Sequence, residues 1–246
     1  MLDSLFCRIL LVISWIVSMP FFFGSSLATS TRQVNPEIYK NEILFDVYRD
    51  GDRVGSHKVV FVKTGNSLEV RSKFSLQIDF LFLTAFKYFY ESVEVWQNGR
   101  LVRLEADVDD DGISSRVGAI LNGGQFTIQT GDLSYTANAP IFPTNHWHAG
   151  VLKQTRVLNT LTGRINSVEI ISKEREAIST ENGLVQATRF VYKGDLQNEV
   201  WYDDDGRWVK MRFNGRDGTP IEYICRSCQG LPPVSGTMEY KPVNAN

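Results

Sequence analysis

Every second residue from position 68 to position 78 is apolar or small, and every residue between these is polar. The first set is Leu68, Val70, Ser72, Phe74, Leu76 and Ile78, and the second is Glu69, Arg71, Lys73, Ser75 and Gln77. Because successive strand side chains point to opposite faces of a sheet, this period predicts a strand with one buried face and one solvated face. The period recurs in Val102, Leu104, Ala106 and Val108, and in Val209, Met211 and Phe213.

Short turn signals separate these runs. They are Asp50-Gly51, Asn98-Gly99, Asp111-Gly112, Gly123-Gly124, Asn182-Gly183, Asp205-Gly206 and Asp217-Gly218. Tight hairpins place both central residues at positive φ, which Gly, Asn and Asp tolerate. Strands joined in this way predict an all-β fold built as a large antiparallel meander. Because a large sheet must hide its edges, we expect it to curl into a barrel or half-barrel.

Residues 139–152 (APIFPTNHWHAGVL) interrupt the strand pattern. Pro140 and Pro143 cannot donate to a sheet ladder. Thr144 or Asn145 can cap a short helix that ends near residue 153. We therefore expect one short helix or lid near residues 144–153, lying between two runs of strands.

The N-terminus has the form of a secretory signal peptide. An apolar run at positions 9–23 precedes Ser26-Leu27-Ala28, whose small residues suit a cleavage site. The run is shorter than the roughly 20 residues of a membrane-spanning helix. The alternative is an uncleaved anchor or a buried helix, because Asp3 and Arg8 offset each other and leave the head of the segment without net charge.

These features predict a periplasmic or secreted protein with four parts. We expect a signal peptide at residues 1–28, an N-terminal extension at 29–41, a single β domain at 42–228 and a Pro-containing flexible tail at 229–246. After signal removal, no other segment is apolar and long enough to span a membrane.

Composition and motifs exclude several functions. The formal net charge is −2 and there is no basic tract, so nucleic acid is not an expected partner. The chain has no nucleophile elbow, phosphate loop or dinucleotide fingerprint, and we expect no cofactor. Residues 107–112 (DVDDDG) match the first half of a calcium loop, but Gly118 stands where that loop needs a Glu. We expect a solvated turn there and no metal.

Two cysteines, Cys225 and Cys228, lie close to the C-terminal tail. An oxidising compartment would tend to join them in a disulfide, and two free thiols are the alternative. A role in thiol–disulfide catalysis would need a helix that begins at the first cysteine. The Gly-Leu-Pro-Pro sequence at 230–233 rules that helix out.

Residues 80–90 (FLFLTAFKYFY) carry six aromatic side chains. If this segment is extended, Phe86, Tyr88 and Tyr90 share one face. A strand that is apolar on both faces either is covered by another element or lines an apolar binding surface. The candidate ligand is a lipid-like or other apolar small molecule, and the candidate partner is an envelope protein.

The histidines form the other candidate site. His146 and His148 flank Trp147, and His57 is the third histidine of the chain. On a strand, His146 and His148 would point the same way and could ligate a metal, whereas on a helix they diverge. The alternative is structural, with Trp147 in the core and the histidines hydrogen-bonded. A histidine with an Asp as general base would instead indicate a hydrolase or isomerase.

Several segments together resemble an uncharacterised family of secreted bacterial proteins, a domain of unknown function. The segments are residues 45–57 (FDVYRDGDRVGSH), 90–96 (YESVEVW) with 99–101 (GRL), Trp147 with 158–163 (LNTLTG), and 200–203 (VWYD) with 206–209 (GRWV). In pattern, the family is similar to curled antiparallel sheets of the lipoprotein-carrier kind, and more weakly to another unassigned periplasmic β family. The resemblance implies this fold and compartment but no activity and no catalytic residues.

The leading functional hypothesis is an extracytoplasmic binding or scaffold protein that holds an apolar or amphipathic ligand on the concave sheet face. The candidate ligand-binding residues are His57, Phe86, Tyr88, Tyr90, His146, Trp147 and His148. The alternatives are a hydrolase or isomerase that uses His57, His146 or His148, and a structural envelope protein.

Overall fold

A computed structural model describes residues 36–80 and 83–230. The predicted signal peptide at 1–28 lies outside the described residues. So do most of the predicted extension at 29–41 and most of the predicted tail at 229–246. Among the described residues, no helix has the length and apolar character needed to cross a membrane.

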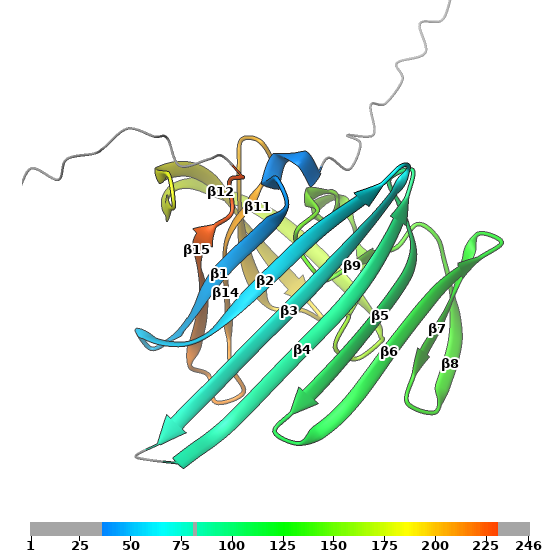
Figure 1. Cartoon of the computed structure of the whole chain (residues 1–246), viewed down its shortest axis with the longest axis horizontal. Coiled ribbons are helices and arrows are strands. Elements are labelled where there is room, and N and C mark those ends of the chain that lie inside the picture. The colour runs from blue at the N-terminus through cyan, green and yellow to red at the C-terminus, as the bar shows by residue number, and fades with distance from the viewer. Residues whose placement is uncertain (1–35, 81–82, 231–246) are drawn as a thin grey trace, which may run out of the picture. The chain divides into compact units, whose positions relative to one another are not determined.

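Fifteen strands and two short 3-10 helices make up the described chain (Figure 1). The strands are β1 (Glu42–Arg49), β2 (Asp52–Thr64), β3 (Ser67–Phe80), β4 (Leu83–Gln97), β5 (Arg100–Asp110), β6 (Ile113–Asn122), β7 (Gln125–Thr130), β8 (Leu133–Asn138), β9 (Phe142–Pro143), β10 (Arg156–Leu158), β11 (Ile165–Thr180), β12 (Gly183–Gly194), β13 (Asn198–Asp203), β14 (Trp208–Asn214) and β15 (Pro220–Ser227). The helices are η1 (Pro36–Tyr39) and η2 (Ala149–Lys153).

All fifteen strands form one sheet, in the order β8-β7-β6-β5-β4-β3-β2-β1-β15-β14-β13-β12-β11-β10-β9. Strands that follow one another in the chain lie side by side, except β8 and β9, and β1 also pairs with β15. All pairs are antiparallel apart from the short parallel pair β9–β10. The predicted all-β fold, a curled antiparallel meander, is therefore confirmed. The sheet stays open, with β8 and β9 as its edges.

Side chains of β7 and β8, at one edge, bond to the connection between β10 and β11, close to the other edge. Thr130 Oγ1 donates to the Thr162 carbonyl at 3.1 Å, and the Tyr135 hydroxyl donates to the Gly163 carbonyl. Gly163 has a φ of 69°, and a Cβ added there would lie 2.8 Å from Thr130 Cβ. Glycine is needed at this position both for its backbone conformation and for the close approach of the edges.

Four of the seven predicted turns have positive φ at both central residues, whereas Asn182-Gly183, Asp205-Gly206 and Asp217-Gly218 have it at the glycine alone. In the turn between β5 and β6, Asp111 has a φ of 54° and Gly112 a φ of 89°. Asp109 Oδ1 accepts a hydrogen bond from the Gly112 backbone N–H at 2.7 Å. The acidic residues at 107–112 thus end a strand and form a hairpin turn.

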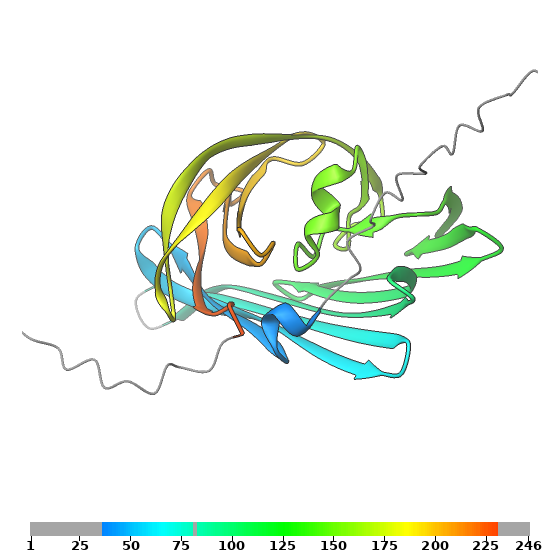
Figure 2. The same ribbon diagram turned by 90° about the horizontal axis from the view of Figure 1, so that it is seen from above.

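The segment between β8 and β10 enters the curl, as Figure 2 shows for η2. The predicted short helix is present only as this 3-10 turn. Its N-cap is His148, whose Nδ1 accepts from the Gly150 N–H at 2.9 Å. The predicted caps, Thr144 and Asn145, were wrong, because the Asn145 side chain turns instead to partners on β4. We call residues 144–153 the plug.

Aromatic side chains fill the space between the sheet and the plug. Trp147 packs edge-on against Trp96, with ring centroids 5.4 Å apart, and against Phe61 at 5.3 Å. Trp208 packs on Phe45 at 4.5 Å on the other side of the interior. All five side chains are buried. The inner face of β4 is formed by the even-numbered residues from Phe86 to Trp96. This face and the plug therefore share one core.

Candidate functional site

A buried carboxylate anchors the plug. Glu94 lies on the inner face of β4 and is fully buried. It accepts hydrogen bonds from Asn145 Nδ2 at 2.5 Å, from Trp96 Nε1 at 2.7 Å and from Trp147 Nε1 at 3.0 Å. Asn145 Oδ1 in turn accepts from the Tyr90 hydroxyl at 2.7 Å. The plug is thus held to β4 by a connected polar network.

Further hydroxyl groups hold the plug backbone. The Tyr202 hydroxyl of β13 donates to the His146 carbonyl at 2.6 Å. The Tyr39 hydroxyl of η1 donates to the Trp147 carbonyl at 2.9 Å and accepts from the Trp208 backbone N–H at 2.7 Å. Because buried backbone groups need partners, these contacts fix the backbone at His146 and Trp147, which lie outside any helix or strand.

Burial sets the electrostatics of this network. It raises the pKa of Glu94 to about 7, although the three hydrogen-bond donors lower it. All three donors are neutral, so the ionised carboxylate is stabilised by dipoles rather than by a buried cation. Glu94 is therefore a titratable group inside the core, next to the plug.

The three histidines are also buried. Burial lowers the pKa of His57 to about 3, with a further lowering from His146 nearby, and it lowers the pKa of His146 and of His148 to about 4. His146 contacts Asn198 Nδ2 at 3.1 Å through Nε2. Neither ring nitrogen of His57 has a hydrogen-bond partner. All three rings therefore stay neutral in the folded protein at neutral pH.

The fold brings His57 and His146 into one interior but supplies no acid to activate them. Both rings pack against Trp208, with centroid distances of 5.6 and 5.8 Å. Among the described residues, no carboxylate is hydrogen-bonded to any of the three histidines. A histidine that acts as general base is usually oriented by such a group, and this arrangement gives the hydrolase or isomerase hypothesis no support.

A different surface lies at the end of the sheet where β3 and β5 end and β4 and β6 begin (Figure 1). In the sheet, Ile78 of β3 pairs with Phe86 of β4. Tyr88 of β4 pairs with Asp110 of β5, and Asp110 pairs in turn with Ile113 of β6. Directly paired residues share a face of the sheet. These apolar side chains therefore extend the inner rows of β3, β4 and β6 beyond the plug.

Leu83 continues the inner row of β4, because a register shift between Ile78 and Asp79 changes the alternation beyond Phe86. The neighbouring Thr84 points outward, since its Oγ1 contacts the Gln77 amide at 3.4 Å on the outer face of β3. We call the resulting surface the apolar mouth and define it as Ile78, Leu83, Phe86, Tyr88 and Ile113. Leu83 and Ile113 are 77% and 75% exposed, whereas the other three are half-buried against the core.

One ion pair crosses the apolar mouth. Arg216, in the turn between β14 and β15, pairs with Asp110 Oδ2 at the end of β5. Both groups act on Tyr88, whose pKa is raised to about 12, first by burial and then by Asp110. The Arg216 side chain is 79% exposed. Because Arg216 is exposed, water screens its attraction to Asp110.

Two hollows in the described part of the molecule are lined by none of the predicted site residues. An apolar cavity of about 40 Å³ is lined by Trp96, Leu101, Leu121, Ile141 and Phe142 together with adjacent residues. A surface depression of about 450 Å³ lies over β1, β14 and β15. Its charged groups Arg212 and Glu222 are already paired with Glu199 and Lys210.

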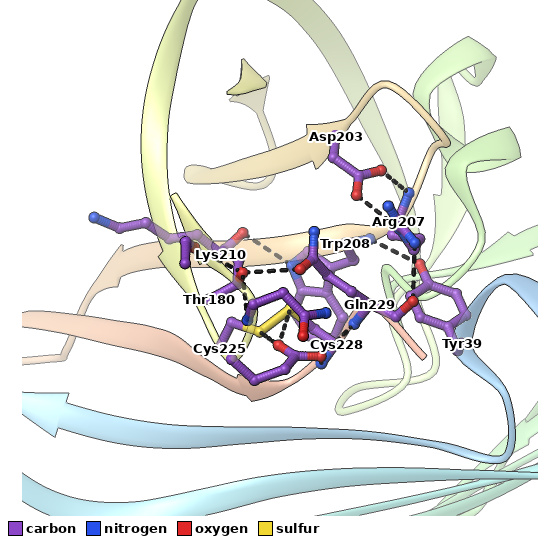
Figure 3. The surroundings of a disulfide bond; sticks show 12 residues. Tyr39, Thr180, Asp203, Arg207, Trp208, Lys210, Cys225, Cys228 and Gln229 are labelled. Carbon is purple, nitrogen blue, oxygen red and sulfur yellow. Dashed lines mark hydrogen bonds and ion pairs between the residues drawn. A yellow bond between two sulfur atoms is a disulfide. The ribbon is translucent and has the colours of Figure 1, made fainter. Parts of the chain in front are cut away.

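A further polar site lies at the end of β15 (Figure 3). We call it the β15 corner and define it as Cys225, Cys228, Gln229 and Glu181. Cys225 and Cys228 are joined by a disulfide, with Cα atoms 5.8 Å apart. Glu181, in the turn between β11 and β12, accepts from the backbone N–H groups of Cys228 and Gln229, each at 2.8 Å. This carboxylate lies against the disulfide.

The structure thus divides the predicted site residues into separate places. Phe86 and Tyr88 lie at the apolar mouth, and Cys225 and Cys228 lie at the β15 corner. The others, His57, Tyr90, His146, Trp147 and His148, are in the buried interior or at its edge. Sequence analysis missed Glu94. It shares the alternating positions of Tyr90 and Trp96 along the strand, and this alternation predicts that its side chain faces inward. Sequence analysis also missed Glu181, for which the sequence carries no local signal.

Fold and site together define a class of protein: an open, barrel-like antiparallel sheet whose interior holds a plug and whose one end bears an apolar surface. Within this class, the chain belongs to a family described as a domain of unknown function, DUF6134, which matches residues 45–226. The predicted membership of an uncharacterised family is confirmed.

A solved structure shares the fold. The chain is similar to the crystal structure of a beta-barrel-like protein of the domain of unknown function DUF1849 from Brucella abortus. The TM-score is 0.56 at 12% sequence identity, and the match covers 76% of this chain and 96% of that chain. At this identity the likeness supports the curled β fold alone. No curated protein matches the chain.

Proposed function

We propose that this protein is an extracytoplasmic binding protein, periplasmic or secreted, that holds the apolar chain of an amphipathic molecule at the apolar mouth. The compartment follows from the signal-like segment at residues 1–28. The observation that carries the binding role is the exposure of Leu83 and Ile113 on the inner face of the sheet. Exposed apolar residues that continue a buried row indicate a binding surface.

The buried interior leaves little room for a ligand. Trp96, Trp147 and Trp208 occupy it, and the plug is hydrogen-bonded on several sides. The cavity of about 40 Å³ beside Trp96 is far below the roughly 300 Å³ of a small-molecule pocket. A ligand at the mouth would instead extend the core outward, stacking on Phe86 and Tyr88.

The polar rim suits an amphipathic rather than a purely apolar ligand. Arg216 and Asp110 lie beside Tyr88, where Arg216 presents a cationic group to solvent and the Asp110 side chain is only 20% exposed. A charged or polar head group can exchange for one partner of this weak ion pair. The apolar chain would then cover Leu83 and Ile113.

Native mass spectrometry of the protein purified from its own host tests the proposal. We expect extra mass that disappears on denaturation, with the size of a single amphipathic molecule. The double variant Phe86→Ala, Tyr88→Ala is expected to lose this mass while keeping the circular dichroism of the folded sheet. A bare mass for the wild-type protein, together with no uptake of an added fatty acid, would overturn the binding role and favour a scaffold.

A further inference from the structure

The β15 corner carries a group of side chains that neither the plug nor the apolar mouth uses. Glu181 Oε1 is fixed by two backbone donors, the N–H groups of Cys228 and Gln229. Gln229 is itself held, because Thr180 Oγ1 donates to its side-chain Oε1 at 2.9 Å and Arg207 Nη1 donates to its carbonyl at 2.8 Å. The Glu181 carboxylate therefore has a built orientation, although it lies on the surface.

The other carboxylate oxygen faces sulfur. Glu181 Oε2 lies 2.9 Å from Cys225 Sγ and 3.6 Å from Cys228 Sγ. A disulfide sulfur carries no proton, so neither contact is a hydrogen bond while the disulfide stands. Among the described residues, no N–H or O–H group donates to Oε2. Three electron-rich atoms thus face one another with nothing electropositive between them.

We propose that Cys225, Cys228 and Glu181 form a redox-gated site for a divalent cation of the zinc class. Their ligand atoms all lie within 4.8 Å of one another. Zinc binds cysteine thiolates and carboxylate oxygens in a tetrahedron, and three protein ligands leave one position for water. This set is independent of the binding function proposed for the apolar mouth.

The disulfide closes the site, because a sulfur bonded to sulfur is not an anionic ligand. A dithiol reductant opens it by thiol–disulfide exchange. The protein disulfide gains two electrons and two protons to become two thiols, and the dithiol is oxidised to its own disulfide. Cation binding then replaces the two thiol protons, which leave to solvent.

The surroundings allow both steps. Glu181 is exposed while Cys225 and Cys228 are buried, so a cation approaches from the side of the carboxylate. The disulfide spans a sequence separation of 3 residues, and so short a loop contributes little to stability through chain entropy. The sheet is therefore expected to stay folded when the bond is reduced.

Cobalt(II) binding to the full chain carrying Cys7→Ser tests the site, since this background leaves Cys225 and Cys228 as the two thiols. The protein reduced with a dithiol, which is then removed under nitrogen, is expected to bind one Co²⁺ with the thiolate charge-transfer and visible bands of a tetrahedral site. The oxidised protein is expected to bind none. Absence of these bands in the reduced protein, or equal binding by the oxidised protein, would overturn the proposal.

Three variants separate ligation from folding. Glu181→Gln is expected to weaken Co²⁺ binding by at least roughly 10- to 100-fold, the effect of losing a group that supports a metal site. Glu169→Gln is the control and is expected to leave binding unchanged, because Glu169 is an exposed residue on β11. Undiminished binding by Glu181→Gln would reject the three-ligand set.

The variant Cys225→Ser, Cys228→Ser is expected to fold and bind no Co²⁺; if it fails to fold, the disulfide is structural and the gating is rejected.

Discussion

Glu94 Oε2 lies 3.0 Å from Trp147 Nε1, so a carboxylate in the middle of a strand holds the indole of a segment 53 residues away. The same oxygen accepts from Trp96, and the other oxygen accepts from Asn145. Because these groups are all buried, the plug and β4 are joined by bonds that water cannot replace. This relationship explains how an irregular segment stays inside a curled sheet.

Glu94→Gln is expected to destabilise the protein by about 2–3 kcal/mol. The substitution turns an amide N–H₂ toward buried N–H donors that need an acceptor and leaves one of them unsatisfied in the core. Urea unfolding at pH 8 measures the change. Glu91→Gln is the matched control, because Glu91 lies on the exposed face of the same strand and pairs only with exposed Lys73. Equal effects of the two substitutions would contradict the anchoring role of Glu94.

The folded protein is expected to lose stability in acid through its histidines. The pKa values of His57, His146 and His148 are lowered from 6.5 to about 3, 4 and 4. The unfolded chain therefore binds more protons, and this contribution is complete above pH 6.5 and lost as the pH falls toward 4 and below. Glu94 acts in the opposite sense: its pKa is raised from 4.5 to about 7, so its contribution is lost as the pH rises through that range.

His57→Phe isolates one of these contributions. The His57 ring packs edge-on against Phe74, Trp208 and Tyr223. A phenyl ring there keeps the contacts and removes the titration, so the slope of unfolding free energy against pH between 4.5 and 6 is expected to fall by about 1.4 kcal/mol per pH unit. Urea titrations across that range measure the slope. An unchanged slope would mean that His57 titrates alike in the folded and unfolded chain.

Arg216→Ala is expected to speed ligand entry without weakening the fold. It removes the ion pair with Asp110 across the mouth, a type of pair that contributes only about 0–1 kcal/mol. Stopped-flow association of a fluorescent fatty acid is expected to become several-fold faster in the variant. Added salt is expected to speed entry into the wild-type protein but not into the variant. Arg116→Ala is the control, because Arg116 is 78% exposed and pairs with Asp107 away from the mouth. Equal rates in both variants would contradict a gating ion pair.

Gly163→Ala is expected to loosen the contact between the two sheet edges and to lower the unfolding free energy by about 1–3 kcal/mol. Its φ is 69°, and the new Cβ would meet Thr130 at 2.8 Å. Gly123→Ala is the control, since Gly123 has a φ of 57° but open space around it. Thermal unfolding that shows the same loss for both variants would mean that backbone strain, not edge contact, sets the effect.

Most of the fold could be predicted because its signals are local. Alternation at 68–78 predicts a strand, and β3 runs from Ser67 to Phe80. The turn at Asp111-Gly112 likewise has the predicted positive φ at both residues. The pairing of β1 with β15 could not be predicted, since it joins opposite ends of the chain and depends on contacts rather than on local pattern.

The site was only partly predictable, for the same reason. Phe86 and Tyr88 were singled out by composition and lie at the mouth, where Leu83 and Ile113 join them only through the ladder. Glu94 was recognisable as a charge in an inward-facing position, but its partner Asn145 lies 51 residues away.

Binding of a fluorescent fatty acid to three forms of the protein shows whether a ligand occupies the apolar mouth. Leu83→Ser with Ile113→Ser removes the exposed side chains of the mouth, whereas Leu184→Ser removes a side chain that is 74% exposed near the β11–β12 turn. We expect the double variant to raise the Kd at least about tenfold, because covering each side chain contributes about 1–3 kcal/mol, and Leu184→Ser to bind like the wild type. Equal affinity in all three forms would contradict a ligand site at the apolar mouth.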